Sequence, residues 1–435
     1  MADFKVKENQ MLDEKYFTFT HKSGLEVFVF PKKMTTKYAI FATRYGAVDN
    51  KFKHADDKEF TVVPDGIAHF LEHKMFECEN GIDAFELYAK TGANANAFTS
   101  NNITAYIFSC TENFYESLEI LLDFVTHPYF TEKTVEKEQG IIGQEIKMYE
   151  DHPGVRMHRE LMKALYKENK MRIDVAGTVE SIAEITAETL YKCYNIFYNL
   201  RNMTLCICGD VDLERIEATC DKILSVAEPF NIVRDPESEN EPREVYKKKT
   251  VCKLDVSKPL FSIGIKDSDI PKEPKERTKK AYATEILDEI LFSQSSEFYN
   301  NLYSQNLIAQ DLSSGCEVGK NYSFNVISSE SSNPDKVYSM FLDYIEETKK
   351  KGLDKEAFEL SKRTVYASNI KSFDSVEDIG NNFMFNYFDG ADILDTPEII
   401  NSITYEYVEE LFNNSFKEEY YALCVVEPLG KEQDE

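Results

Sequence analysis

Residues 64–76 constrain this chain of 435 residues more than any other stretch. They read Pro-Asp-Gly-Ile-Ala-His-Phe-Leu-Glu-His-Lys-Met-Phe. Asp65 is a good N-cap, which predicts a helix that starts just after it. On that helix His69 and His73 are four residues apart and project from one face, with Glu72 at its edge. Apolar residues surround them on nearly all sides, so we expect a buried helix whose histidines need a chemical reason.

The functional interpretation of this stretch is a metal site. His-x-x-Glu-His is the inverted zinc-protease pattern, in which two neutral imidazoles bind Zn²⁺ and the carboxylate activates a water molecule. The alternative is a pair of core histidines that are hydrogen-bonded to an acid. A catalytic zinc needs a third protein ligand and an open position, so the rest of the chain has to supply one more donor.

A candidate for that donor lies on the helix predicted over residues 131–150. Its apolar residues form one face, and Glu138 and Glu145 fall in the middle of that face. Two buried carboxylates are costly unless they are paired or bound to metal. The alternative is that both acids bond only to nearby backbone groups or to an arginine.

His69-Phe-Leu-Glu-His73, followed by Glu138-x6-Glu145, resembles the pitrilysin/insulinase family of zinc peptidases, which includes the mitochondrial processing peptidase. The resemblance implies that His69, His73 and Glu145 hold one Zn²⁺ per chain. It implies Glu72 as the general base and Glu138 as an acid that orients a ligand. It also implies an α+β fold like that of the processing peptidase, with two homologous domains, each a mixed or antiparallel sheet flanked by helices.

A third match is Asn96-Ala97-Phe98-Thr99, which precedes a strand predicted over residues 104–108. In the family this segment is an edge strand to which the substrate backbone is added as a further strand. The resemblance therefore implies Asn96, Ala97, Phe98 and Thr99 as substrate-binding residues. Main-chain hydrogen bonds of this kind give affinity with little demand on the substrate sequence.

The charge and the apolar pattern exclude several classes of partner. The net charge is −27, which argues against nucleic acid. No apolar run approaches the length that a membrane helix needs, and residues 1–10 lack an apolar signal core, so we expect no membrane span and a cytoplasmic protein. Nine cysteines without a CxxC pair predict free thiols. The histidines outside the motif lack ligand spacing, and we expect them at the surface or in loops.

Two halves are predicted from composition and from a weak repeat. Residues 229–249 combine prolines with acids and predict an exposed linker between domains at 1–228 and 250–435. Ile185-Thr186 and Leu205-Cys206 recur, at one constant offset, as Ile403-Thr404 and Leu423-Cys424, which predicts two copies of one α+β unit. With small gaps, this offset maps His69, Glu72 and His73 onto Leu287, Ile290 and Leu291. We therefore expect no metal ligands in the second copy.

The resemblance also bears on partners. Family members often supply an Arg and a Tyr seven residues apart from their second half, and these groups hold the oxyanion. The corresponding positions here are Tyr303 and Gln310. The chain thus resembles the metal-bearing subunit of a pair, a group labelled as associated with elongation factor P 5-aminopentanol modification. We expect a heterodimer with a homologous subunit that lacks the zinc motif, with a homodimer or an idle monomer as the rivals.

These patterns together predict a zinc metalloendopeptidase that hydrolyses peptides or unfolded polypeptides inside a dimer that encloses them. Two alternatives stay open at this stage. One is a maturation peptidase for a single modified peptide, and the other is a non-catalytic peptide-binding subunit.

Overall fold

The structure, a computed structural model, describes residues 3–79, 81–235, 240–309 and 312–430. Gln310, one of the two positions expected for an oxyanion clamp, lies outside these residues. Contacts divide the chain into two compact units, and each unit is discontinuous in sequence. The first unit comprises Met1–Ile146, Ile173–Pro236 and Ile370–Asp395, and the second comprises Lys147–Arg172, Glu237–Asn369 and Thr396–Glu435.

The first unit is built on a seven-stranded mixed sheet in the order β1-β2-β3-β9-β4-β8-β7. β3 and β9 are parallel, and the other neighbouring pairs are antiparallel. β7 is therefore an edge strand. The bounds are β1 (Lys5–Asn9), β2 (Glu14–Thr20), β3 (Glu26–Pro31), β4 (Lys37–Thr43), β7 (Asn94–Thr99), β8 (Thr104–Cys110) and β9 (Met203–Gly209).

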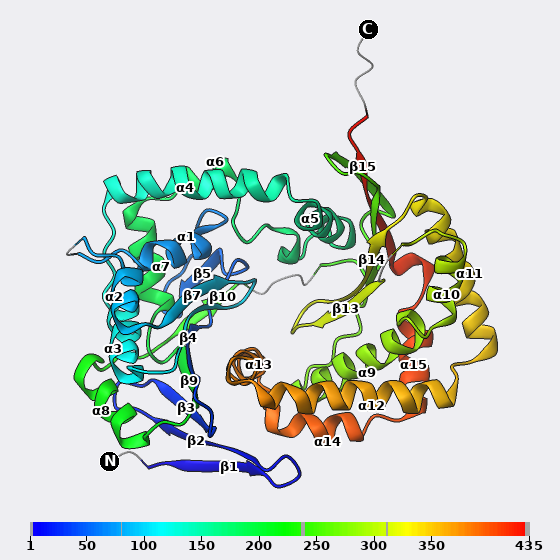
Figure 1. Cartoon of the computed structure of the whole chain (residues 1–435). Coiled ribbons are helices and arrows are strands. Elements are labelled where there is room, and N and C mark those ends of the chain that lie inside the picture. The colour runs from blue at the N-terminus through cyan, green and yellow to red at the C-terminus, as the bar shows by residue number, and fades with distance from the viewer. Residues whose placement is uncertain (1–2, 80, 236–239, 310–311, 431–435) are drawn as a thin grey trace. The chain divides into compact units, whose positions relative to one another are not determined.

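Helices cover both faces of this sheet (Figure 1). Most of them pack over one face and build the larger core with buried aromatic and aliphatic side chains. α13 (Val376–Asp389) packs on the other face, against β4 and β9. The remaining helices of this unit are α1 (Ile67–Met75), α2 (Ala84–Thr91), α3 (Phe114–Thr126), α4 (Glu132–Glu150, whose last four residues belong to the second unit), α6 (Val179–Ile182), α7 (Ala187–Phe197) and α8 (Leu213–Ile223).

The charged segment at residues 50–61 forms part of a small sheet. β5 (Lys51–His54) pairs with β6 (Thr61–Val62) and with β10 (Ile232–Arg234). The pairing of β5 with β10 brings together segments that lie far apart in the chain. A charged segment gives no local signal for such a pairing, because the partner strand that satisfies its backbone groups is distant in sequence.

The second unit repeats the central topology of the first. Its five strands lie in the order β11-β15-β12-β14-β13, with one parallel pair, β11 and β15, in the place of β3 and β9. The predicted fold of two homologous α+β domains is therefore confirmed. The bounds are β11 (Lys249–Leu254), β12 (Leu260–Lys266), β13 (Ser313–Val318), β14 (Ser323–Glu330) and β15 (Tyr421–Pro428).

Helices also cover both faces of the second sheet, and one of them comes from the first half of the chain. α5 (Pro153–Leu165) packs on β11, β12 and β15, and its Leu161 would touch a Cβ placed at Gly264 at 2.8 Å. The two halves thus exchange an equivalent helix. α5, from the first half of the chain, packs on the second sheet, and α13, from the second half, packs on the first sheet. The other helices are α9 (Pro274–Phe292), α10 (Glu297–Ser304), α11 (Pro334–Lys351), α12 (Lys355–Lys371), α14 (Thr396–Asn401) and α15 (Tyr405–Ser415).

α9 follows β12 as α1 follows β4, so the two helices are equivalent. Residues 285–292, Glu-Ile-Leu-Asp-Glu-Ile-Leu-Phe, align with residues 69–76, His-Phe-Leu-Glu-His-Lys-Met-Phe. In this register Glu285, Asp288 and Glu289 take the places of the motif, two residues before the positions that the constant offset gives.

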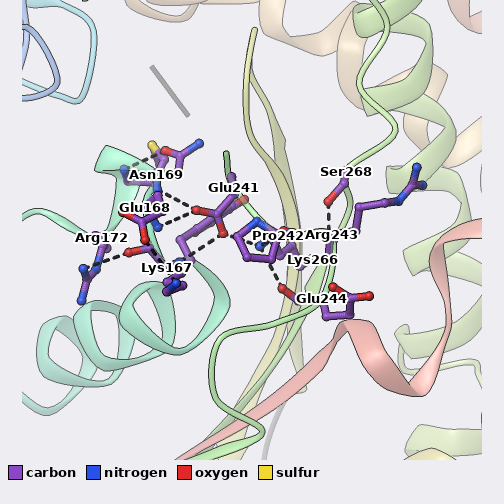
Figure 2. Close-up of polar contacts among 12 residues, drawn as sticks. Lys167, Glu168, Asn169, Arg172, Glu241, Pro242, Arg243, Glu244, Lys266 and Ser268 are labelled. Atoms are coloured by element: carbon purple, nitrogen blue, oxygen red, sulfur yellow. Dashed lines mark hydrogen bonds and ion pairs between the residues drawn. The ribbon is translucent and has the colours of Figure 1, made fainter. Parts of the chain in front are cut away.

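The segment after residue 239 is anchored to the second unit by Glu241 (Figure 2). Its carboxylate accepts backbone N–H bonds from Lys167, Glu168 and Asn169 at 3.1, 2.6 and 2.7 Å. It also accepts a bond from the buried ammonium of Lys266 at 2.5 Å. Burial alone would raise the pKa of Glu241, but Lys266 and the three N–H donors outweigh it and hold that pKa below its usual value. At least this part of the expected exposed linker is therefore fixed.

Among the described residues, no helix is both long enough and apolar enough to cross a membrane.

Candidate metal centre

α1 begins one residue later than its sequence predicts, and Asp65 does not cap it. Gly66 is the N-cap residue, with a φ of 88°. A Cβ at Gly66 would lie 2.5 Å from the carbonyl oxygen of Ala176, so only glycine fits this left-handed and crowded position. The Asp65 carboxylate instead accepts a hydrogen bond from Asn50 at 2.6 Å. The tight turn at Gly66 sets the direction in which the helix enters the core.

The apolar side chains of α1 bury the helix as its sequence predicts. Ile67, Ala68, Phe70, Leu71 and Met75 are almost fully buried in the larger core of the first unit. This packing fixes the position of the histidine face of the helix. The side chains of His69 and His73 are 12% and 26% exposed, so both rings remain accessible to solvent.

α4 lies alongside α1 and brings a carboxylate to the two imidazoles (Figure 1). Glu145 Oε1 lies 3.8 Å from His69 Nε2, and Glu145 Oε2 lies 3.3 Å from His73 Nε2. Ligand atoms of these three residues all lie within 4.8 Å of one another, and no other group in the described chain meets this condition. Donors about 2.0–2.1 Å from a tetrahedral zinc lie about 3.4 Å apart, so the donor set fits a zinc ion.

The Nδ1 atoms of the two histidines have different surroundings. His73 Nδ1 lies 3.1 Å from Glu138 Oε1, which fixes the ring so that Nε2 faces Glu145. His69 Nδ1 is buried and has no hydrogen-bond partner among the described residues. Glu138 and Glu145, seven residues apart on one face of α4, therefore contact the same imidazole from two sides. This arrangement places Glu138 where a ligand-orienting acid is expected.

The two histidines differ in their protonation. Burial and the neighbouring His73 ring lower the pKa of His69 to about 4, which keeps its imidazole neutral. Burial also opposes the charged form of His73, but hydrogen bonds with Glu138 and Glu145 outweigh it and raise the pKa of His73 to about 10. These hydrogen bonds therefore favour the protonated form of His73. A metal ion that binds here must displace that proton.

Glu72 is buried beside this centre and is held by a hydroxyl group. Thr99 Oγ1 donates a hydrogen bond to Glu72 Oε2 at 2.6 Å, and Glu72 is only 8% exposed. Burial raises the pKa of Glu72 above its usual value, and the bond from Thr99 partly counters that effect. A buried carboxyl next to a metal-ligand set has the setting of a general acid or base.

The four residues of the predicted substrate strand have different surroundings. Asn96 and Ala97 line a cavity of about 530 Å³ that also borders Glu72 and His73. Phe98 points to the opposite face of the sheet, where its ring stacks on Phe385 of α13 at 5.8 Å. Asn96 Oδ1 accepts a hydrogen bond from the backbone N–H of Ala97 at 2.9 Å. The Asn96 side chain thus covers one main-chain donor of this edge strand.

The residues that give this cavity its charge lie outside the motifs recognised in the sequence. Beyond the motif residues its lining includes the acids Glu77, Asp83 and Glu86, the rings of Phe76 and Phe85, and Lys137 from α4. Phe85 stacks on Phe76 at 4.3 Å and stays 45% exposed. The sequence does contain four acidic residues within residues 77–86, directly after the helix that carries the two histidines. Nothing in the sequence showed that α2 folds back to place them beside Glu72.

A serine–histidine–aspartate array elsewhere in the first unit carries no chemistry. His21 lies between Ser23 Oγ at 2.8 Å and Asp221 Oδ1 at 3.0 Å. Ser23 is fully buried, so no substrate can reach its hydroxyl. The array fixes the turn after β2, so His21 lies in a loop, as expected, although its side chain is buried.

Comparisons with known proteins agree with this geometry. A family profile described as "Insulinase (Peptidase family M16)" matches residues 62–179, which include both histidines and Glu145. A second, "Peptidase M16 inactive domain", matches residues 184–365. The chain is also 39% identical to an uncharacterized zinc protease of Bacillus subtilis, YmfH, over 98% of this chain and 99% of that one. The chain belongs to the M16 peptidase family.

Solved structures place this M16 chain in the same fold. An M16-like peptidase from Alicyclobacillus acidocaldarius has a TM-score of 0.90 and 32% identity, with 99% of both chains covered. Pitrilysin has a TM-score of 0.74 and 15% identity, and the match covers 98% of this chain and 47% of pitrilysin. The predicted membership of the pitrilysin/insulinase family is therefore confirmed. The association with elongation factor P modification stays a prediction.

Proposed function

We propose that this M16 chain is a zinc-dependent endopeptidase that hydrolyses peptides or unfolded polypeptides. The observation that carries the proposal is the meeting of His69, His73 and Glu145 within 4.8 Å, with the buried carboxyl of Glu72 on the same helix. The names of its relatives as zinc proteases support the same activity. Zinc in this donor set would supply a Lewis acid that polarises the scissile carbonyl and a water molecule.

Each residue of the candidate centre then has its own role in the proposed reaction. His69, His73 and Glu145 hold the ion, and Glu138 orients the ring of His73 through Nδ1. Glu72 takes a proton from the attacking water and gives it to the leaving amine. Oε2 of Glu72 is bonded to Thr99, so Oε1 is the atom that we assign to this proton transfer.

The substrate backbone is proposed to add to the outer edge of β7. In the described sheet β7 pairs with β8 on one side only, so its other side offers main-chain donors and acceptors. The carboxamide of Asn96 covers the Ala97 N–H and must turn away as the peptide strand forms. Asn96 and Ala97 then contact the backbone of the peptide, and its side chains enter the cavity next to them.

We further propose that this cavity favours a basic side chain. Glu77, Asp83 and Glu86 oppose one lysine, Lys137, and the rings of Phe76 and Phe85 offer an apolar surface. A lysine or arginine fits this combination, because its apolar stem covers the rings while its charge meets the acids. Matched peptides that differ only by Arg or Glu at one position beside the scissile bond test this preference. Equal cleavage rates would contradict it, and a charge reversal in the lining, Asp83→Lys, should invert it.

The chain is also proposed to work with a related subunit. Members of this family often act as heterodimers, and the position expected for an oxyanion-binding arginine here is Tyr303, which is 55% exposed. Purification of the untagged native complex tests this point. A chain that elutes alone with full activity would contradict the heterodimer, and a homodimer would appear as twice the mass of one chain.

The decisive experiment is cleavage of a mixed fluorogenic peptide library by the zinc-loaded chain, with Glu72→Gln as the blank. We expect cleavage that disappears in the blank, disappears with a chelator and returns with added zinc. The blank should still bind one zinc per chain, because all three ligands remain. A chain that binds zinc but cleaves nothing, either alone or in its native complex, would contradict the proposed activity.

A further inference from the structure

Thr99 differs from its neighbours on β7 in the contact that its side chain makes. Successive residues of a strand point to opposite faces of the sheet. Ala95 and Ala97 pack against the core beneath α1, whereas Phe98 belongs to the core on the other face. Thr99 shares the face of Ala95 and Ala97, and its hydroxyl reaches Glu72 of α1. The last residue of the proposed substrate strand is thus bonded to the proposed general base.

The hydroxyl of Thr99 has little freedom to do anything else. Its register partner on β8 is Thr104, whose Oγ1 lies 3.3 Å away and donates to the carbonyl of Tyr45 at 2.9 Å. The single proton of Thr104 is therefore used by a backbone group, and the single proton of Thr99 is left for Glu72. Threonine is β-branched, so its χ1 is restricted and the donor stays in place.

This bond controls the orientation of the carboxylate. The terminal torsion of a glutamate is broad, so an unbonded carboxylate samples many orientations. The length of 2.6 Å is in the range of short, strong O–H···O hydrogen bonds. With Oε2 held by Thr99, the plane of the carboxylate is set, and Oε1 has one preferred direction. Placement of a catalytic group to within a fraction of an ångström decides much of its rate effect.

We propose that Thr99 is a positioning residue for Glu72, the proposed general base. The proposal rests on the proposed peptidase function and deepens it. It gives the side chain of Thr99 a role different from the substrate binding that family resemblance implies. A substrate-binding hydroxyl would affect KM, whereas a positioning hydroxyl affects kcat.

The test compares Thr99→Val, which keeps the shape and loses the donor, with Thr99→Ser, which keeps the donor. We expect Thr99→Val to lower kcat about 10- to 100-fold with KM changed less than about twofold. Thr99→Ser should recover most of the kcat, and both variants should bind one zinc per chain. Thr126→Val is the matched control, because in the described chain its hydroxyl bonds only to its own helix and its neighbour, and it should behave as wild type. A raised KM with unchanged kcat, or no rescue by serine, would overturn the proposal.

A second readout does not depend on activity. Crystal structures of the zinc-loaded variants should show Glu72 in one conformation in Thr99→Ser and in several in Thr99→Val. A single, unmoved Glu72 in Thr99→Val would overturn the positioning role. If the wild-type enzyme binds zinc but cleaves nothing, the proposed function fails, and this crystallographic comparison still decides the role of Thr99.

Discussion

Glu138 Oε1 lies 3.1 Å from Nδ1 of His73, while Nε2 of the same ring lies 3.3 Å from Glu145. One imidazole is therefore held between two carboxylates of a single helix. Only one of these acids belongs to the group that fits a metal ion, and the other fixes the direction in which the ring presents its ligand atom.

Replacement of Glu138 by glutamine is expected to weaken zinc binding about 10- to 100-fold. The amide lacks the negative charge that lies next to Nδ1 of His73. The imidazole is then a weaker electron-pair donor to zinc, and its orientation is held less firmly. Competition with a chromophoric chelator measures the affinity. Glu136→Gln, an exposed acid on the same helix, is the control and should bind zinc as wild type. An unchanged affinity in Glu138→Gln would show that the acid does not orient His73.

Replacement of Asp288 by asparagine is expected to stabilise the protein increasingly as pH rises. Asp288 is 4% exposed and is bonded through Oδ1 to Asn325, while its Oδ2 and the Oδ1 of Asn325 have no partner within the described chain. Burial, followed by the nearby Glu285 and Glu289, raises the pKa of Asp288 well above its usual value.

The sign of this effect follows from linkage. A carboxyl group whose pKa is raised by folding contributes stability below its unfolded pKa of about 4, and that stability is lost as pH rises toward the folded pKa. The asparagine of the variant cannot ionise, and its amide can donate to Asn325. The difference in Tm between the variant and wild type should grow from pH 4 to pH 8. A constant difference would contradict the prediction, and Asp255→Asn at an exposed position is the control.

Replacement of Glu241 by glutamine is expected to destabilise the second unit by about 3 kcal/mol at neutral pH, because the buried ammonium of Lys266 loses its anion. The pKa of Glu241 is lowered by folding, so its contribution is present above the unfolded pKa of about 4.3 and is lost as pH falls through the folded value. Denaturant unfolding at pH 7 and pH 3 measures both effects. The two proteins should converge at the lower pH, whereas Glu168→Gln, a side chain about half exposed, should match wild type at both.

Replacement of Gly380 by alanine tests whether α13 is held against the first sheet. A Cβ at Gly380 would lie 2.6 Å from ring atoms of Tyr38, which is 2% exposed and bonded to Asn381 at 2.9 Å. The ring cannot move away easily, so we expect a loss of about 2 kcal/mol. Gly140→Ala on α4 meets no atom within 4 Å and should stabilise by up to about 1 kcal/mol. Equal thermal shifts for the two variants would contradict this packing.

The sequence by itself determined which residues form the candidate metal centre, because its signals are local. The four-residue spacing of His69 and His73 and the seven-residue spacing of Glu138 and Glu145 are helical periods, and the apolar residues around them predict burial. Any helix with these spacings presents the same side chains on one face. The family resemblance added the roles that we expect of these residues, and the short repeated segments of the second half predicted the second α+β unit.

Only the tertiary structure decided where that centre meets the rest of the chain. The bond between Thr99 and Glu72, the acids beside the cavity, the pairing of β5 with β10 and the exchange of α5 and α13 join segments that are distant in sequence. Even the start of α1 depends on such a contact, because the backbone of Gly66 packs closely against the carbonyl group of Ala176. Periodicity shows which face of an element is buried, whereas the neighbour that covers this face is selected by the packing of the whole core.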